Sequence, residues 1–333
     1  MERDMESLVQ VKALSVGFRV FEGMLRVLDG ISLRIGQGER VGLVGETGCG
    51  KTTTVKSILR VLPQPPAVIF GGEVLFRGKD VLNMSRRAVH QLYRSSVAAI
   101  FQDPLQALNP VFTVGTQLAD IVRDWATSTG KRLSKKEVFR RCVETLAQTG
   151  MPDPERIMTC YPIQLSGGMR QRVCIAEALV RPVELLLADE PTTNLDVTIQ
   201  DQILRKLDEL VEERQMSVLL ISHSLGVVVD LTERVYIMYA GTIVEEGRTE
   251  ELFSRPKHPY TQGLLKSIPK LTGEGISQGI PGRIPNYLNP PSGCRFHPRC
   301  EHVMPLCARE KPSFVELETR GRVACHLYRG DVT

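Results

Sequence analysis

The 333-residue sequence lacks the long apolar runs that would carry a chain into or across a membrane. No hydrophobic stretch approaches the roughly 20 residues that span a bilayer as a helix. The first six residues, Met1 to Glu6, do not form the apolar core of a secretion signal. We therefore expect a soluble, cytosolic protein, and any work at a membrane must use the helices of other proteins.

The sequence also lacks a large excess of either charge. It has 42 Lys and Arg and 38 Asp and Glu, which gives a formal net charge of +4. So small an excess argues against a nucleic-acid surface as the main feature. A long heptad run is missing too, which excludes a coiled-coil arm. The remaining composition, 42% hydrophobic and 24% charged, suits a globular chain of one large domain with an extension, or of two domains.

A glycine-rich stretch is the most informative feature that is present. Gly45-Glu46-Thr47-Gly48-Cys49-Gly50-Lys51-Thr52 fits the phosphate-loop pattern G-x-x-x-x-G-K-[ST] without a mismatch. Glycines let successive N–H groups turn toward phosphate oxygens, Lys51 reaches the β- and γ-phosphates, and the Thr52 hydroxyl ligates Mg²⁺. A chance glycine-rich turn is the alternative. The predicted ATP-binding residues are Phe18, Gly45, Glu46, Thr47, Gly48, Cys49, Gly50, Lys51, Thr52 and Thr53.

The flanks of this loop favour the nucleotide site. Arg40 to Val44 is typical of a short buried strand, and Val55, Ile58, Leu59 and Leu62 then recur at helical spacing. A loop between a strand and a helix presents phosphate to the helix N-terminus, where the dipole favours negative charge.

Alternating patterns predict half-exposed strands at Leu8–Val16 and Ile31–Ile35, and a further strand at Gly72–Phe76. Phe18 and Phe21 flank a turn between the first two. Either aromatic ring could stack on adenine or pack in the core, and we favour stacking by Phe18.

A helical segment follows Val97–Phe101, a short apolar strand. Gln102 stands at the end of that strand, because Pro104 blocks further regular pairing. Val138, Cys142 and Leu146 share one face of a helix that Gly150 terminates. We predict a helical subdomain at 103–180, inserted into a nucleotide-binding core of 1–102 and 181–257.

The octet Leu165-Ser166-Gly167-Gly168-Met169-Arg170-Gln171-Arg172 begins a helix, with Ser166 as its N-cap. A hydroxyl and two glycine amides at a helix start can bind an anion. An ordinary capped helix explains the octet equally well on its own.

A continuous apolar run, Glu184 to Ala188, ends in Asp189 and Glu190. Buried parallel strands have this pattern, and open α/β sheets bind ligands at the carboxyl ends of such strands. Asp189 can hold hydrated Mg²⁺, and Glu190 can polarise the water that attacks the γ-phosphate. Asn194-Leu195-Asp196 then forms a turn before a helix marked by Ile199, Ile203, Leu207 and Leu210.

The segment Ser217–Ser222 predicts another buried strand, which presents His223 at the same sheet edge. A lone histidine is more often structural, but one placed here can sense the γ-phosphate.

Taken in order, the phosphate loop, Gln102, LSGGMRQR, LLLADE, NLD and His223 resemble the ATPase subunit of an ABC transporter over roughly residues 8–255. The resemblance implies an α/β P-loop fold with an inserted helical subdomain and an N-terminal antiparallel β region. It also implies a head-to-tail dimer, in which one chain's Ser166, Gly167, Gly168 and Asp196 contact ATP held by its partner. Gln102 would contact Mg²⁺ and the attacking water. Thr47, Cys49 and Asn194 depart from the commoner family residues without removing a catalytic group.

The tail, residues 258–333, narrows the resemblance. His258 to Leu265 and Gly279 to Pro285 are similar to the C-terminal extension of di- and oligopeptide importer ATPases. Nickel and some sugar importers of the same branch have similar tails. Dense proline and glycine predict a wrapped, irregular segment. The implied partners are a second ATPase subunit, two membrane permeases and, indirectly, an extracytoplasmic binding protein, with the chain at the cytoplasmic face of the membrane.

Of eight cysteines, Cys294, Cys300, Cys307 and Cys325 lie in the tail, with five, six and seventeen residues between them. Clustered cytosolic cysteines bind metal more often than they form disulfides. Structural zinc sites favour closer pairs. The tail of peptide-importer ATPases, which this segment resembles, is associated with an iron–sulfur cluster, so we expect a 4Fe-4S cluster, with zinc as the alternative.

A soluble ABC-type ATPase acting on DNA or the ribosome is the alternative of a different class. Such proteins usually need tandem ATPase domains or a long coiled-coil insert. This chain has a single phosphate loop and no long heptad run.

Overall fold

The protein is seen in a computed structural model that describes residues 7–192, 195–267, 279–318 and 321–329. The chain forms two compact units. Unit 1 comprises Met1–Gly36, Arg40–Asn83 and Ile221–Thr333, and unit 2 comprises Gln37–Glu39 and Met84–Leu220. No helix of the described ranges is both long and apolar enough to cross a membrane.

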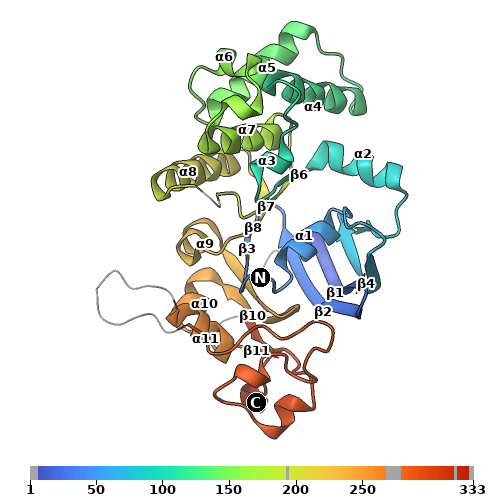
Figure 1. The fold of residues 1–333 in the computed structure, drawn as a ribbon, viewed down its shortest axis with the longest axis vertical. Helices are drawn as coiled ribbons and strands as arrows, with labels where there is room; N and C mark the ends of the chain where they lie inside the picture. The colour runs from blue at the N-terminus through green and yellow to red at the C-terminus, as the bar shows by residue number, and fades with distance from the viewer. Residues whose placement is uncertain (1–6, 193–194, 268–278, 319–320, 330–333) are drawn as a thin grey trace. The chain divides into compact units, whose positions relative to one another are not determined.

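Unit 1 begins with an antiparallel sheet in the strand order β2-β1-β4-β5. The strands are β1 (Ser7–Val20), β2 (Gly23–Gly36), β4 (Ala67–Phe76) and β5 (Lys79–Asp80) (Figure 1). The three strands predicted in this region are confirmed, and each is longer than its alternating pattern. In β1 the alternation of apolar and polar residues stops near Gly17, next to a shift in strand register. The strand nevertheless stays paired with β2 and β4 on both sides of its register shifts, so it extends beyond the alternating pattern.

The second sheet of unit 1 surrounds β3 (Arg40–Val44). This strand pairs in parallel with β9 (Arg234–Tyr239), which in turn pairs antiparallel with β10 (Thr242–Arg248). The described part of the same unit also contains the helices α1 (Lys51–Ile58), α9 (Leu225–Leu231), α10 (Thr249–Ser254) and α11 (Pro259–Lys266). Side chains from the strands and helices of this unit pack in one hydrophobic core, which includes Val44, Val235, Ile237, Tyr239 and Tyr260.

The tail is not wholly irregular, contrary to the prediction. Its strands β11 (Val315–Glu316) and β12 (Arg322–Val323) pair with each other, and β12 extends the sheet beside β10. Its described residues also form 3₁₀ turns at His297–Arg299, Pro305–Ala308 and His326–Tyr328. Strands of two residues are too short to show an alternating pattern, so they could not be predicted from the sequence.

Unit 2 combines parallel strands with a helical layer. β6 (Val97–Ile100) pairs with β7 (Leu185–Asp189), whose other neighbour is β8 (Ser217–Ile221). All five residues of β7 and of β8 are buried, which confirms the two buried strands predicted here. The helices are α2 (Arg86–Ser96), α3 (Pro104–Ala107), α4 (Val114–Ser128), α5 (Lys135–Gln148), α6 (Pro154–Thr159), α7 (Gly167–Leu179) and α8 (Val197–Glu213).

The helices from α4 to α7 enclose a core of their own. Val138, Cys142 and Leu146 are buried on one face of α5, as their spacing predicted, and Gly150 follows with a φ of 73°. Helix α2, which begins before β6, was not predicted from the sequence.

Candidate functional site

The phosphate loop occupies the turn between β3 and α1, where the sequence placed it (Figure 1). Gly48 and Gly50 have φ values of 83° and 111°, which side chains with a Cβ rarely adopt. Gly45 is required for a different reason, because a Cβ there would lie 2.1 Å from the Met238 carbonyl oxygen. The glycine pattern thus reflects the space and the torsions of this turn.

Lys51 is 5% exposed at the first position of α1. Its Nζ donates to the carbonyl oxygens of Gly45 at 2.7 Å and Glu46 at 3.1 Å. The ammonium group is therefore held across the mouth of the loop, at the position from which a lysine can contact phosphate. Cys49 is fully buried beneath it, and burial raises the pKa of the Cys49 thiol.

Helix α1 is shorter than its apolar pattern suggested. It ends at Ile58, so Leu62 lies beyond it rather than on its face. Arg60 has a left-handed φ of 54°, and the N–H of Val61 returns to the Lys56 carbonyl oxygen at 3.0 Å, which closes the helix end.

In unit 2, β6 and β7 present the predicted polar residues at one edge. Ile100 lies opposite Ala188 in parallel register, so Gln102 and Asp189 leave the two strands at the same end. Gln102 is exposed, whereas Asp189 is 3% and Glu190 8% exposed.

Glu190 has a left-handed φ of 52°. A residue with a Cβ pays for this conformation, and such strain is concentrated at functional sites. The peptide that follows is fixed as well, because the Gln171 amide of α7 donates to the Pro191 carbonyl oxygen. The nearly buried Glu190 carboxylate is therefore held in a defined position at the end of β7.

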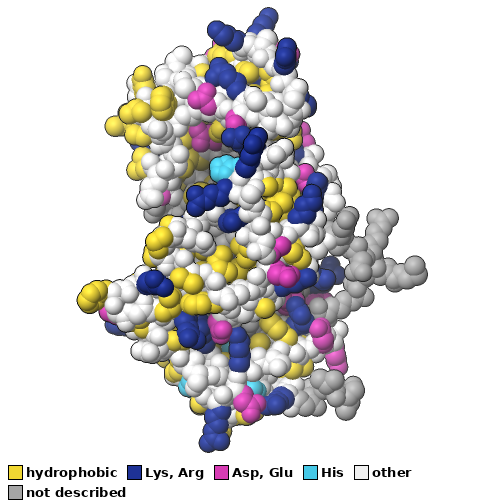
Figure 2. Space-filling model, turned by 90° about the vertical axis from the view of Figure 1, so that its right-hand side faces the viewer, with side chains coloured by type: hydrophobic (Ala, Val, Ile, Leu, Met, Phe, Trp, Pro, Cys, Tyr) yellow, Lys and Arg dark blue, Asp and Glu magenta, His cyan; other side chains and the backbone are white. Residues whose placement is uncertain are grey.

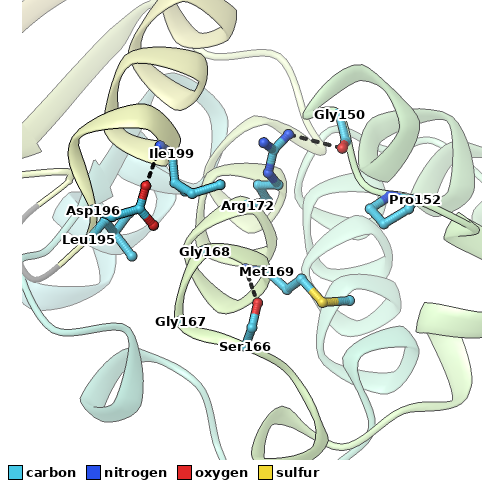
Figure 3. A pocket seen from close by; sticks show the side chains of 10 residues that line it. All are labelled: Gly150, Pro152, Ser166, Gly167, Gly168, Met169, Arg172, Leu195, Asp196 and Ile199. Carbon is cyan, nitrogen blue, oxygen red and sulfur yellow. Dashed lines mark hydrogen bonds between the residues drawn. The ribbon is translucent and has the colours of Figure 1, made fainter.

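The octet and the turn before α8 line one pocket of about 560 Å³ in unit 2 (Figure 3). Ser166 caps α7 by accepting a hydrogen bond from the Met169 N–H at 3.3 Å, and Asp196 caps α8 through the Ile199 N–H at 2.9 Å. The four residues predicted to contact a partner's ATP, Ser166, Gly167, Gly168 and Asp196, therefore lie together. Asn194 falls outside the described residues.

Arg172 belongs to the same pocket and was not singled out in the sequence. Its guanidinium donates to the Gly150 carbonyl oxygen at 2.9 Å (Figure 3). It also donates to the Thr149 carbonyl oxygen at 3.0 Å and to Gln202 Oε1 at 3.2 Å. It ties α7 to the end of α5 and to α8. Its place as the last letter of the octet was the available signal.

The remaining predicted residues lie in unit 1. His223 is exposed, two residues beyond the end of β8. Phe18 is half-buried within β1, opposite Leu25, and Phe21 is fully exposed in the β1–β2 turn. Thr52 and Thr53 form the first turn of α1.

Cys294 interacts electrostatically with Cys300, Cys307 and Cys325. The described residues nevertheless include no group of three or more His, Cys, Asp or Glu arranged to hold a metal ion. The Cys294 N–H donates to the Cys307 carbonyl oxygen at 2.8 Å. Burial raises the pKa of the Cys294 thiol to about 11, with smaller effects from the other three thiols. Burial raises the pKa of Cys300 and of Cys325 as well. As they stand, these residues do not form a ready-made ligand set.

Comparison with known proteins agrees with this geometry. The family model described as ABC transporter matches residues 28–193, and the one described as oligopeptide/dipeptide transporter, C-terminal region, matches residues 244–307. The chain is 42% identical over 320 residues to a probable peptide ABC transporter ATP-binding protein of Sinorhizobium fredii, covering 96% of this chain and 94% of the relative. It is also 42% identical over 324 residues to the dipeptide transport ATP-binding protein DppD of Bacillus subtilis, with 97% and 95% covered.

Solved structures give the same result. A bacterial ABC transporter cassette, determined as a dimer, matches with a TM-score of 0.65 at 25% identity and covers 72% of this chain and 98% of its own. A post-hydrolysis dimer of that cassette, bound to ADP and Pi, matches with a TM-score of 0.65 at 26% identity and the same coverage.

The fold and the phosphate loop define a P-loop ATPase of the ABC cassette type. The chain belongs to the ATP-binding subunits of ABC transporters, in the oligopeptide/dipeptide branch of that family. Its enzymatic activity is ATP hydrolysis, and ATP and Mg²⁺ are the cofactors that this class implies.

Proposed function

We propose that this chain drives the import of di- or oligopeptides, by closing a head-to-tail ATPase dimer on ATP and reopening it after hydrolysis. The observation that carries the proposal is the phosphate loop on β3 in a chain whose tail matches the oligopeptide/dipeptide model over residues 244–307. The names of the relatives refer to peptides, which favours peptides over nickel or sugars. A transporter tail also disfavours a soluble ATPase acting on nucleic acid or the ribosome.

The loop residues fit ATP. Its glycines leave no room for a Cβ at Gly45, and Lys51 is already held at the loop by carbonyl oxygens that phosphate would replace as its partners. We assign residues 45–53 to the triphosphate and Phe18 to adenine. Bound Mg²⁺ supplies positive charge to the phosphate oxygens, and Thr52, Gln102 and Asp189 are the residues that would hold it.

Glu190 orients and deprotonates the attacking water, and His223 contacts the γ-phosphate. Ser166, Gly167, Gly168 and Asp196 contact ATP bound to the partner subunit. That role suits their arrangement, since a capped helix N-terminus lined by glycine amides attracts phosphate.

The proposed partners are a second ATPase subunit, related or identical, and two membrane permeases at the cytoplasmic face, with an extracytoplasmic binding protein acting through them. Exposed apolar side chains of unit 2 support a permease contact. Leu105, Val111, Phe112 and Ile163 are 62%, 70%, 50% and 75% exposed. The segments that carry them meet where the Val114 N–H donates to the Cys160 carbonyl oxygen at 2.9 Å. Figure 2 shows hydrophobic side chains gathered on the surface of unit 2.

Glu190→Gln tests the ATPase assignment. Glutamine keeps the shape but cannot accept the proton, so hydrolysis should fall by about 10²–10⁴-fold while ATP still binds. The variant should accumulate as an ATP-bound dimer in size-exclusion chromatography. Turnover at the wild-type rate, with a competent partner present, would contradict the role of Glu190.

The 4Fe-4S cluster predicted for Cys294, Cys300, Cys307 and Cys325 stays a proposal, with Zn²⁺ as the alternative. It is supported by the proximity of the four thiols, although ligation requires them to move and lose protons. Anaerobically purified protein should be brown and contain about four irons per chain. Colourless protein with one zinc would replace the cluster with a zinc site.

A further inference from the structure

We propose that the C-terminal tail is a positioning element for the phosphate loop. Three tail side chains, Tyr260, Tyr287 and Arg299, hydrogen-bond to the outer side of the loop and hold it in the shape that receives phosphate. The inference rests on the assignment, made above, of residues 45–53 as the ATP site.

Tyr260 fixes the first peptide of the loop. Its hydroxyl accepts a hydrogen bond from the Glu46 N–H at 2.9 Å, although the two residues are 214 positions apart. The ring is fully buried on α11, 4.7 Å from the Tyr239 ring and 5.4 Å from the Phe296 ring. His258 caps this helix by accepting from the Tyr260 N–H at 3.0 Å. The hydroxyl is therefore presented from a rigid support.

Arg299 holds the side chain of the same loop residue. Its Nη1 pairs with Glu46 Oε2 at 3.0 Å, and the arginine side chain is only 6% exposed. The other guanidinium nitrogens donate to the Pro281 carbonyl oxygen at 2.7 Å and the Ile280 carbonyl oxygen at 3.0 Å. With each nitrogen occupied, the guanidinium is fixed, and an ion pair of this kind is stronger than one in water.

Tyr287 orients a second loop peptide. Its hydroxyl donates to the Gly48 carbonyl oxygen at 2.7 Å. In a trans peptide the N–H points away from the carbonyl oxygen, so this bond turns the Cys49 N–H away from the tail. That N–H donates to the Glu46 carbonyl oxygen at 3.2 Å, across the loop.

All three contacts are hydrogen bonds or ion pairs to specific polar atoms of Glu46 and Gly48. They come from α11, from the segment before the cysteines and from the turn between Cys294 and Cys300, three separate parts of the tail. Gly48 and Gly50 carry high conformational freedom in an unsupported chain. Holding the loop in advance lowers the ordering cost of binding ATP, so the tail should act on affinity more than on the chemical step.

The test measures ATP binding and turnover of the full-length chain with two conservative variants, Tyr287→Phe and Arg299→Gln. Tyr287→Phe removes the bond to the Gly48 carbonyl oxygen, and Arg299→Gln removes the charged pair with Glu46 together with bonds inside the tail. The ATP dissociation constant should therefore rise by about three- to tenfold for Tyr287→Phe and more for Arg299→Gln. KM should rise in parallel, while kcat at saturating ATP stays near wild type.

Arg329→Gln is the matched control, because Arg329 belongs to the same tail but pairs with exposed Glu310 at 2.9 Å. It should bind ATP as wild type does. A double-mutant cycle of Glu46→Gln with Arg299→Gln should show that the second change costs little once the first is made. Nucleotide-free melting temperatures separate this effect from unfolding, and that of Tyr287→Phe should match wild type.

Lys51→Ala separates the two proposals. If it abolishes ATP binding while Tyr287→Phe and Arg299→Gln bind like wild type, the tail has no positioning role and the ATP site stands. If Lys51→Ala binds ATP normally, the site assignment itself is wrong. A fall in kcat with unchanged KM in the tail variants would also overturn the positioning role.

Discussion

His258 is a single side chain whose burial has a measurable consequence for pH. It is 1% exposed, its Nδ1 accepts from the Tyr260 N–H, and burial lowers its pKa from 6.5 to about 3. The folded state therefore keeps the ring neutral at a pH where the unfolded chain is protonated. Its contribution to stability is complete above pH 6.5 and is lost as the pH falls from 6.5 toward 3.

His258→Asn should flatten this dependence, because the asparagine oxygen can still accept from the Tyr260 N–H but does not titrate. Between about pH 6.5 and 5, the wild-type free energy of unfolding should lose up to about 1.4 kcal/mol per pH unit from this group, and the variant should not. Urea titrations at several pH values measure the difference. The exposed His302→Asn should keep the wild-type slope, and equal slopes for His258→Asn would contradict the assignment.

The positions of site residues that belong to a local sequence motif were predictable from the sequence. Lys51 and Asp189 stand where the chain patterns place them, at a helix start and a strand end. Tyr260 and Arg299 were not, because their hydroxyl and guanidinium reach the loop only through the folded tail. Nothing local in the sequence encodes a contact across more than 200 positions.

Among the elements, α5 has a complete capping box. The Ser134 hydroxyl accepts from the Glu137 N–H at 3.2 Å, and Glu137 accepts from the Ser134 N–H at 2.7 Å. The hydrogen bond from Ser134 lowers the pKa of the exposed Glu137 carboxyl. Two N–H groups that a helix start leaves without partners are satisfied in this way.

Ser134→Ala should lower the free energy of unfolding by about 1 kcal/mol, since the Glu137 N–H loses its acceptor. Urea denaturation followed by circular dichroism measures it. Lys136→Ala, on the exposed surface of the same turn, is the control and should stay within about 0.5 kcal/mol of wild type. A loss at Lys136→Ala as large as that at Ser134→Ala would contradict the role of the cap, since alanine is itself a better helix former than lysine.

Helices and strands with a clear pattern of apolar residues were predictable from the sequence. Elements that depend on contacts with distant parts of the chain were not. Nearly continuous apolar runs predicted β7 and β8, whose residues are all buried, and the spacing of Val138, Cys142 and Leu146 predicted α5. Strand β12 exists because β10 offers it an edge. Helix α1 ends before Leu62 because Arg60 adopts a left-handed conformation, which the spacing of apolar residues does not predict.

For the whole molecule, the arrangement of Ser166 and Asp196 in one pocket bears on assembly. If each ATP is shared by two subunits, Ser166→Arg should reduce dimer hydrolysis by about 100-fold or more, because a long side chain fills the helix start that faces the partner's phosphates. The variant's own ATP affinity should be unchanged. Arg205→Ala, which alters an exposed pair on α8, is the control.

Mixing experiments decide the outcome. Ser166→Arg combined with wild-type partner subunits should leave one of the two sites impaired. Loss of the variant's own ATP binding, with dimer turnover intact, would place Ser166 in its own chain's site and contradict the shared arrangement.

The bonds from the tail to the phosphate loop also impose an order of events during synthesis. Glu46 leaves the ribosome more than 200 residues before Tyr260 and Arg299, its two partners. The nascent cassette therefore carries a loop without its outer hydrogen bonds for most of its translation, which proceeds at about 5–20 residues per second. For a period on the order of ten seconds or more, the phosphate loop lacks these hydrogen bonds, and its affinity for ATP rises when the tail folds onto it.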